Sequence, residues 1–216
     1  MIQIPIESMN LMLLNVGLAQ HYADWNWQNV SSPFIRIFYV VEGGAILHLK
    51  NQDIVLRPHH LYIIPAYTVH SYECHGRFVH YYLHVFEGFK NDMNLQDVYE
   101  LPTEVAGTEG MKQMFEFLCA RHPDARLPQS DPKSYDTSSQ TSDYVVRYRD
   151  MDLWKKIELR GAMLMIMSRP CGSRQPERLS GDGRRLSPQV LPAECSAQEC
   201  DCWRRLPDRK RARLHL

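Results

Sequence analysis

The sequence lacks both a long apolar run and a net charge. No stretch reaches the ~18–20 apolar residues that a membrane-spanning helix needs, so we do not expect a transmembrane protein. Lys and Arg together number 25, as do Asp and Glu, so nothing global points to nucleic acid or to a membrane surface. Residues 1–17 lack the basic start of a signal peptide, and Glu7 and Asn10 interrupt their apolar part. We therefore expect a cytoplasmic protein.

Motifs of nucleophilic and phosphate-binding enzymes are also missing. The chain has no G-x-S-x-G element, and Gly43-Gly44 has neither the spacing nor the following helix of a phosphate-binding loop. Cys74 and Cys119 lie in apolar contexts, where a buried thiol is unreactive. We therefore expect a protein that is not an enzyme and that carries no cofactor.

Aromatic residues almost disappear after residue 169. Residues 170–216 contain one, Trp203, and are rich in Arg, Pro, Ser, Cys and Gly without a helix or strand period. A strongly patterned helix runs directly into this tail at Pro170, which favours a shift of reading frame near Arg169. The alternatives are a disordered tail, a basic arm that binds nucleic acid, and a metal knuckle. The knuckle would use Cys195, Cys200 and Cys202, whose spacing is not a zinc-ligand pattern.

Residues 38–86 show the strand rhythm of a small antiparallel β-barrel. Short runs of Val, Ile, Leu, Phe and Tyr are broken at close intervals by turn-forming groups such as Gly43-Gly44, Asn51-Gln52-Asp53 and Arg57-Pro58. Small barrels enclose a cavity, and such cavities bind ligands. We therefore assign residues 1–100 to a barrel.

A helical segment is predicted over residues 101–169, with one helix at 108–122 and another at 143–169. In the first helix, apolar residues recur at helical spacing between Thr108, the expected N-cap, and Pro123, which ends it. The polar, Pro- and Ser-rich residues 123–142 are predicted to form a mobile loop, with Ser142 or Asp143 capping the second helix. The fold class is α+β by order of elements, and mainly β.

Three groups of residues resemble one known family. They are Gly43-Gly44, the run LRPHHLYIIP from Leu56 to Pro65, and His70-Ser71-Tyr72. Over roughly residues 10–169 the chain resembles a cupin barrel (a double-stranded β-helix), and within cupins the N-terminal effector-binding and dimerisation domain of AraC-type transcription regulators. His59-His60 stands where that family usually has Gly-Asp. The resemblance implies a small-molecule sensor.

The resemblance also implies the residues of the ligand site. Tyr72 of the closing His-x-Tyr would face the pocket together with His70, and alternate residues of the next strand, Tyr81 and Leu83, would add to it. His and Tyr carry hydrogen-bonding groups on apolar bodies, which suits a sugar or a polyol. The alternative is that these are core residues satisfied by neighbouring backbone. That alternative, or simple surface exposure, applies with more force to His48, His75, His80 and His84.

A homodimer and a partner domain are further implications of the resemblance. An antiparallel pair of helices would form the dimer, and AraC-type regulators continue into helix-turn-helix units that bind DNA. No paired amphipathic helices follow Arg169, so we expect DNA binding in the full-length parent and not in this chain. The helix residues implied in the dimer are Trp154, Ile157, Gly161, Leu164 and Met165.

A metal site is the competing hypothesis, because cupin enzymes hold metals and histidines are frequent here. Counted from Gly43, the metal-ligand positions of cupins fall on Leu49 and Asn51. His48 is one residue out of register and should face the other side of its strand. Only His70 matches a ligand position, whereas a catalytic site normally needs three protein ligands. A stand-alone cupin metalloenzyme or small-molecule-binding protein remains the alternative.

Overall fold

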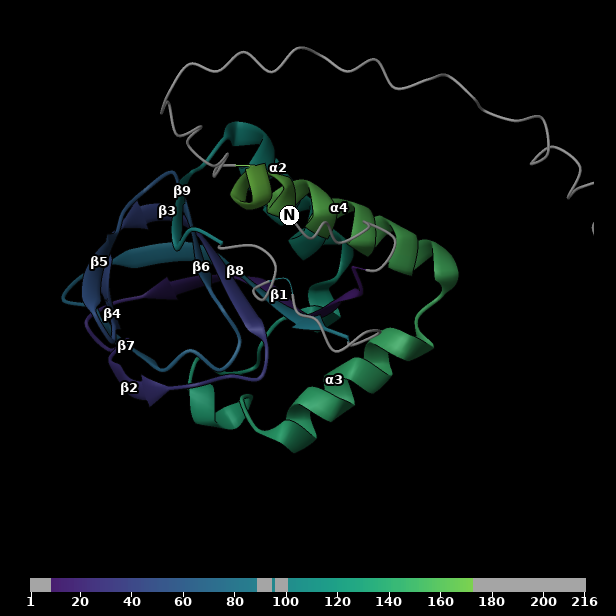
Figure 1. Cartoon of the computed structure of the whole chain (residues 1–216), viewed down its shortest axis with the longest axis horizontal. Coiled ribbons are helices and arrows are strands. Elements are labelled where there is room, and N and C mark those ends of the chain that lie inside the picture. The colour runs from purple at the N-terminus through teal and green to yellow at the C-terminus, as the bar shows by residue number, and fades with distance from the viewer. Residues whose placement is uncertain (1–8, 89–94, 96–100, 173–216) are drawn as a thin grey trace, which may run out of the picture. The chain divides into compact units, whose positions relative to one another are not determined.

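The computed structural model of the chain describes residues 9–88, 95 and 101–172. In this part of the chain two antiparallel sheets form a barrel, and helices cover the outer face of one sheet (Figure 1). No helix within these ranges is both long and apolar enough to cross a membrane. The predicted features of the tail after residue 172, including Cys195, Cys200 and Cys202, lie outside the described residues.

Nine strands build the two sheets in the described part of the chain, which confirms the mainly β, cupin-like barrel followed by helices. The first sheet has the order β1-β8-β3-β6-β9, with β1 Leu11–His21, β8 Phe78–Glu87, β3 Ile35–Gly43, β6 His60–Ile64 and β9 Glu104–Ala106. The second has the order β2-β7-β4-β5, with β2 Trp27–Val30, β7 His70–Glu73, β4 Ala45–Leu49 and β5 Gln52–Leu56. The strand β9 adds residues beyond the predicted barrel limit at residue 100.

The strands β3 and β8 are buried on both faces, because the first sheet separates two hydrophobic cores. One core fills the barrel between the sheets and includes Phe38 and Phe78. The other lies between the first sheet and the helices and includes Ile37, Leu83 and Phe115. This double burial explains why both strands read as almost continuous apolar runs.

Gly43 makes the turn between β3 and β4. Its φ is +75°, in the left-handed region that glycine adopts without strain. A Cβ atom at this position would also collide with the carbonyl oxygen of Arg77. The glycine turn of the sequence motif is therefore required by both backbone conformation and space.

The first predicted helix is confirmed almost to the residue. The helix α2 spans Glu109–Arg121, and the Thr108 hydroxyl accepts a hydrogen bond from the backbone N–H of Met111, as expected of an N-cap. Pro123 begins a short 3-10 helix, η2, over Pro123–Ala125, so it does end the α-helical run.

The second predicted helix is two helices, and the loop before it is partly structured. The helix α3 spans Ser138–Asp150 and α4 spans Leu153–Gly172, because Met151 takes an extended conformation that ends α3. Residues 123–142 contain η2, a second 3-10 helix η3 (Pro132–Ser134) and the first turn of α3. Thr137 caps α3, in place of the predicted Ser142 or Asp143.

Candidate functional site

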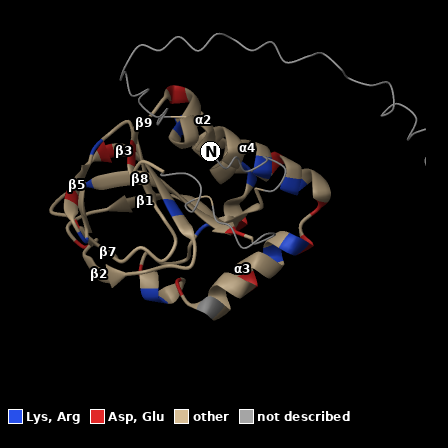
Figure 2. Cartoon of the chain, in the orientation of Figure 1, with Lys and Arg blue, Asp and Glu red and all other residues tan. Residues whose placement is uncertain are grey.

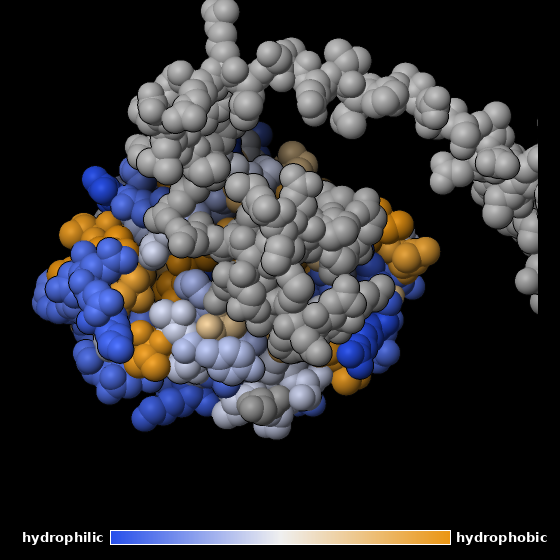
Figure 3. All heavy atoms as spheres, in the orientation of Figure 1, coloured by the Kyte–Doolittle hydropathy of each residue, from blue (hydrophilic) through white to orange (hydrophobic). Residues whose placement is uncertain are grey.

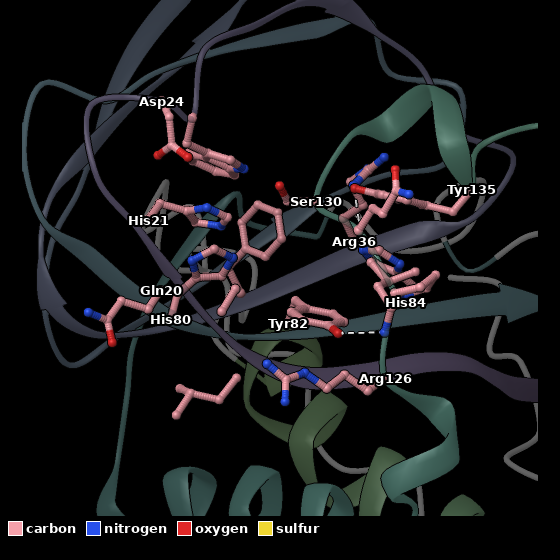
Figure 4. A pocket seen from close by; sticks show the side chains of 17 residues that line it. Gln20, His21, Asp24, Arg36, His80, Tyr82, His84, Arg126, Ser130 and Tyr135 are labelled. Atoms are coloured by element: carbon pink, nitrogen blue, oxygen red, sulfur yellow. Dashed lines mark hydrogen bonds between the residues drawn. The ribbon is translucent and has the colours of Figure 1, made fainter.

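A polar cavity of about 230 Å³ lies between the inner face of the first sheet and the segment that joins α2 to α3. The strands β1, β3 and β8 supply one wall, and residues 126–130 with Tyr135 supply the other. Figure 4 shows His21 and His80 next to each other on one side, Arg36, His84 and Tyr135 on the other, and Tyr82 between the two groups. Imidazole, phenol and guanidinium groups from distant parts of the chain therefore converge on one space.

Strand pairing sets the geometry of the barrel-side wall. In the antiparallel pair of β3 and β8, Arg36 lies opposite His84 and Phe38 lies opposite Tyr82. Side chains of directly opposite residues in such a pair share a face and touch. The pairing therefore brings a cation, an imidazole and a phenol to the inner face of the sheet.

The imidazoles of the cavity wall are uncharged at pH 7. Burial lowers the pKa of His80 and that of His84 well below the usual 6.5, because a charged ring would lose its water. The positive charge of Arg36 lowers the pKa of His84 further. Burial also lowers the pKa of His21, against the opposing effect of Asp24. Each neutral ring offers one hydrogen-bond donor and one acceptor.

The tautomer of His84 follows from its neighbour. Its Nε2 lies 3.4 Å from Nη1 of Arg36, and a guanidinium can only donate. Nε2 is therefore the acceptor, and the neutral ring carries its proton on Nδ1. In the described part of the chain, the buried Nδ1 atoms of His84 and His80 have no hydrogen-bond partner. Such unsatisfied groups are costly, and a ligand that supplied partners would relieve that cost.

Arg36 fastens the far wall of the cavity to the barrel. We call residues 126–136 the strap. The Arg36 side chain, 2% exposed, contacts both carboxylate oxygens of Asp136 at 2.6 and 2.7 Å and donates to the Tyr135 hydroxyl at 3.1 Å. The Ser32 hydroxyl accepts two further hydrogen bonds from the Arg36 guanidinium, from Nη2 at 2.7 Å and from Nε at 3.0 Å. Burial alone would lower the pKa of Arg36, but Tyr135, Tyr72 and Asp136 raise it, so the guanidinium stays charged.

A second contact fastens the other end of the strap. The backbone N–H of Leu127 donates to the Tyr82 hydroxyl at 2.8 Å. Burial raises the pKa of Tyr82 to about 12, so the phenol keeps its own proton to donate. Between the two attachments Pro128, Gln129 and Ser130 are exposed, and no hydrogen bond joins them to any other described residue. The strap is thus fixed at its ends and free in its middle.

His70 and Tyr72 face the same way, as predicted, but lie behind the cavity wall. Nδ1 of His70 donates to the carbonyl oxygen of Thr68 at 2.7 Å, and its Nε2 accepts from the Tyr72 hydroxyl at 2.7 Å. Burial lowers the pKa of His70 to about 4. Trp25, which lines the cavity, stacks on Tyr72 with ring centroids 4.2 Å apart. His70 and Tyr72 therefore satisfy each other's hydrogen-bonding groups, and Tyr72 supports Trp25 in the cavity wall.

The structure corrects the predicted register of β8. Tyr81 points to the helices, with its hydroxyl 3.4 Å from Glu116 of α2, and Leu83 is buried in the helix-side core. Because both faces of this strand are buried, the sequence shows no polar alternation that would identify the inner face. The β8 residues that line the cavity are His80, Tyr82 and His84.

His48 lies on the outer face of the second sheet, opposite to the buried Leu47. Its Nδ1 is 2.8 Å from Asp53 and its Nε2 is 3.0 Å from Glu73. The hydrogen bond to Asp53, helped by Glu73, raises the pKa of His48. Among the described residues, no three His, Cys, Asp or Glu side chains are placed to share a metal ion.

Sequence reasoning missed the groups that shape this site. Arg36 carries a usable signal, since it is the one charged residue in the apolar run FIRIFYVV of residues 34–41. A charge in a buried strand requires a partner, and here the partner is Asp136. His80 and His84 carry no comparable signal, because histidine is common both on surfaces and in cores.

The helix face implied in dimerisation is mostly exposed. On α4, Trp154 is 52% exposed, Ile157 64% and Met165 60%, and Gly161 is exposed beside them. Leu164 is partly buried against the helix-side core. Figure 3 shows hydrophobic surface at the end of the molecule where α4 begins. Both basic and acidic residues lie around the α3–α4 junction next to this region (Figure 2).

The model of one protein family matches the chain. It is the AraC-like ligand binding domain, and it matches residues 15–122, half of the chain. No curated protein matches the sequence significantly.

Several solved structures are similar to part of the chain. A cupin superfamily protein from Desulfitobacterium hafniense is 18% identical, with a TM-score of 0.31, over 39% of this chain and 84% of its own. The EutQ protein of Clostridium difficile is 14% identical, with a TM-score of 0.28, over 32% and 53%. Salicylate 1,2-dioxygenase from Pseudaminobacter salicylatoxidans is 13% identical, with a TM-score of 0.30, over 32% and 20%.

Proposed function

The chain belongs to the AraC-like ligand binding domain family, and we propose that it is the non-catalytic sensor domain of a cytoplasmic AraC-type transcription regulator. Family membership makes the barrel a small-molecule-binding domain. In the proposed role, its cavity binds a small neutral molecule that carries several hydroxyl groups, namely a sugar or a polyol. The ligand class is argued from the charges and hydrogen-bonding groups of the cavity.

Charge balance favours a neutral ligand. Asp136 neutralises the only deep cation of the described cavity wall, Arg36, and the buried imidazoles are uncharged. At the rim, Arg126 and Asp24 have opposite signs. A carboxylate ligand would compete with Asp136 for one guanidinium, whereas a hydroxyl group adds no charge to a buried site.

The unsatisfied imidazole nitrogens carry the proposal. His84 presents a buried N–H donor without a partner, and Nδ1 of His80 is equally unpaired in the described part of the chain. A hydroxyl group both donates and accepts, so it can satisfy either nitrogen and the Tyr82 phenol. The cavity of about 230 Å³ lies below the ~300–1,000 Å³ of most ligand pockets, which suits a single sugar ring.

Calorimetric titration with a panel of pentoses, hexoses, polyols and the matching sugar acids tests this proposal. We expect a neutral member of the panel to bind and its acid to bind more weakly. Tyr82→Phe should weaken that binding about tenfold, because it removes one hydrogen bond inside the cavity. Tyr81→Phe is the matched control: it makes the same chemical change on the opposite face of β8 and should leave the affinity unchanged.

Three results would contradict the proposed ligand class. The first is that no neutral sugar or polyol of the panel gives a heat of binding. The second is that a sugar acid binds more tightly than its neutral parent. The third is that Tyr82→Phe and Tyr81→Phe lose the same affinity. The last result would place the ligand outside this cavity.

We also propose that the sensor is a homodimer through α4. One exposed side of α4 carries a stripe made of Trp154, Ile157, Gly161 and Met165. Exposed apolar stripes of this kind are typical of helix interfaces. The guanidinium of Arg121 and the ammonium of Lys155 lie over the Trp154 ring, 5.6 and 5.4 Å from its centroid.

A further inference from the structure

We propose that the strap, residues 126–136, transmits occupancy of the cavity to the helix α3. This regulation deepens the proposed function and rests on it for the identity of the ligand. The mechanical link itself rests on contacts within the chain. The strap forms one wall of the cavity at one end and continues directly into α3 at the other.

The attachment pattern makes the strap responsive. It is held by Tyr82 at Leu127 and by Arg36 at Tyr135 and Asp136. The intervening residues 128–130 line the cavity, are exposed, and form no hydrogen bond with other described residues. A segment with fixed ends and few contacts in its middle is the part that opens most easily.

A ligand in the cavity would bridge the two walls. On the strap side it meets the amide of Gln129 and the hydroxyl of Ser130, and on the barrel side it meets His80 and His84. Hydrogen bonds to both sides would restrain the free middle of the strap against the barrel. The ligand thus favours one arrangement of the strap by the contacts it makes only in that arrangement.

The strap is joined to α3 by a continuous set of hydrogen bonds. Asp136 immediately precedes Thr137, the N-cap, whose side chain accepts from the backbone N–H of Gln140 at 3.4 Å. The Gln140 side chain reaches back both to the N–H of Thr137, at 3.4 Å, and to the carbonyl of Ser134. The capping box therefore ties the first turn of α3 to η3 within the strap. Movement of the Asp136 attachment must move this turn.

Hydrogen exchange measured by mass spectrometry on the ligand-free full chain tests the link. In Asp136→Asn the exchange of the hydrogen-bonded strap amides, those of Leu127 and residues 133–136, and of the first α3 turns, residues 138–145, should become about tenfold faster. Residues 60–64 of β6 should not change. Asp143→Asn is the matched control, because it neutralises an exposed carboxylate on α3 itself and should leave every region at the wild-type rate. Faster exchange confined to the strap, or no change at all, would refute the coupling.

A second variant covers the case in which Asp136→Asn unfolds the protein. That change leaves the Arg36 charge buried without its carboxylate, which is strongly destabilising. The double variant Arg36→Met with Asp136→Leu removes both charges together and releases the same attachment. Selective acceleration in the strap and α3 supports the proposal, and acceleration limited to the strap overturns it.

A ligand-bound arm separates this proposal from the proposed function. With the tightest-binding sugar of the titration panel at saturation, exchange in the strap and in residues 138–145 of the wild type should slow about tenfold. Slowing confined to the barrel strands would overturn the coupling while leaving ligand binding intact. If no sugar binds, the proposed ligand class fails, and the ligand-free variants still decide the coupling.

Discussion

At the scale of single residues, the predicted and observed site residues differ because the role of a side chain depends on its hydrogen-bond and ion-pair partners. The sequence does not show which residues these partners are. The sequence correctly places His70 and Tyr72 on one side of a strand, since two residues apart on a strand is a local rule. It does not show that each satisfies the other. Nor does it show that Arg36 is paired with Asp136, a hundred positions further along the chain.

The buried histidines predict a loss of stability on mild acidification. The folded state holds the pKa of His80 below 6.5 by burial, whereas the unfolded chain titrates near 6.5. Below pH 6.5 the unfolded state therefore binds the extra proton, and the free energy of unfolding falls as the pH is lowered. Each such histidine contributes up to about 1.4 kcal/mol per pH unit, a slope that is reached well below pH 6.5 and lost again near its folded-state pKa.

Urea denaturation between pH 7.5 and 5.5 checks this expectation. The variant His80→Leu should lose less stability over this range than the wild type, by about 1 kcal/mol between pH 6.5 and 5.5. Parallel pH profiles for the wild type and His80→Leu would show that His80 is not held neutral by the fold.

At the scale of elements, the sequence predicts helix ends that depend on neighbouring residues. It does not predict features that depend on contacts with distant parts of the chain. The cap and stop of α2, at Thr108 and Pro123, are local in sequence and were predicted. The cap of α3 is equally local, because Thr137-x-x-Gln140 is a capping box, but its polar surroundings suggest a loop. The inner face of β8 could not be predicted, since burial of both faces removes the alternation that would reveal it.

The α3 cap makes a stability prediction at this scale. Thr137→Ala removes the side-chain acceptor of the capping box and should lower the free energy of unfolding by about 1 kcal/mol. Asp143→Ala, at a position the sequence alone suggests as a cap, lies inside the helix on an exposed face and should be close to neutral. Chemical denaturation of both variants decides which residue caps α3. Equal effects would argue against the observed helix start.

At the scale of the whole molecule, the barrel and the helices form one compact unit through the core on the outer face of the first sheet. The general order of a barrel followed by helices could be predicted, because strand and helix periods differ over short windows. The packing of the helices against the barrel could not be predicted, because it depends on long-range contacts such as that of Tyr81 with α2. The exposed surface of this unit includes the apolar side of α4.

The oligomeric state tests the role of that surface. Wild-type protein should sediment as a dimer at high concentration, and Ile157→Lys should sediment as a monomer. Stability within the protomer should change by no more than ~0.5 kcal/mol, because the side chain is 64% exposed there. Val55→Lys, at a 61% exposed apolar residue on β5, is the matched control and should remain dimeric. A monomeric wild type would contradict the proposed interface.

The double burial of β3 and β8 has a consequence for protein engineering. Along each strand, consecutive positions serve different compartments: Phe38 and Tyr82 face the cavity, while Ile37 and Leu83 face the helices. A combinatorial library confined to the cavity-side positions other than Arg36 and Tyr82, which hold the strap, would vary chemical selectivity while leaving the hydrophobic packing against the helices unaltered. The scaffold therefore lends itself to building biosensors, in which recognition and signal output are optimised in separate rounds of selection.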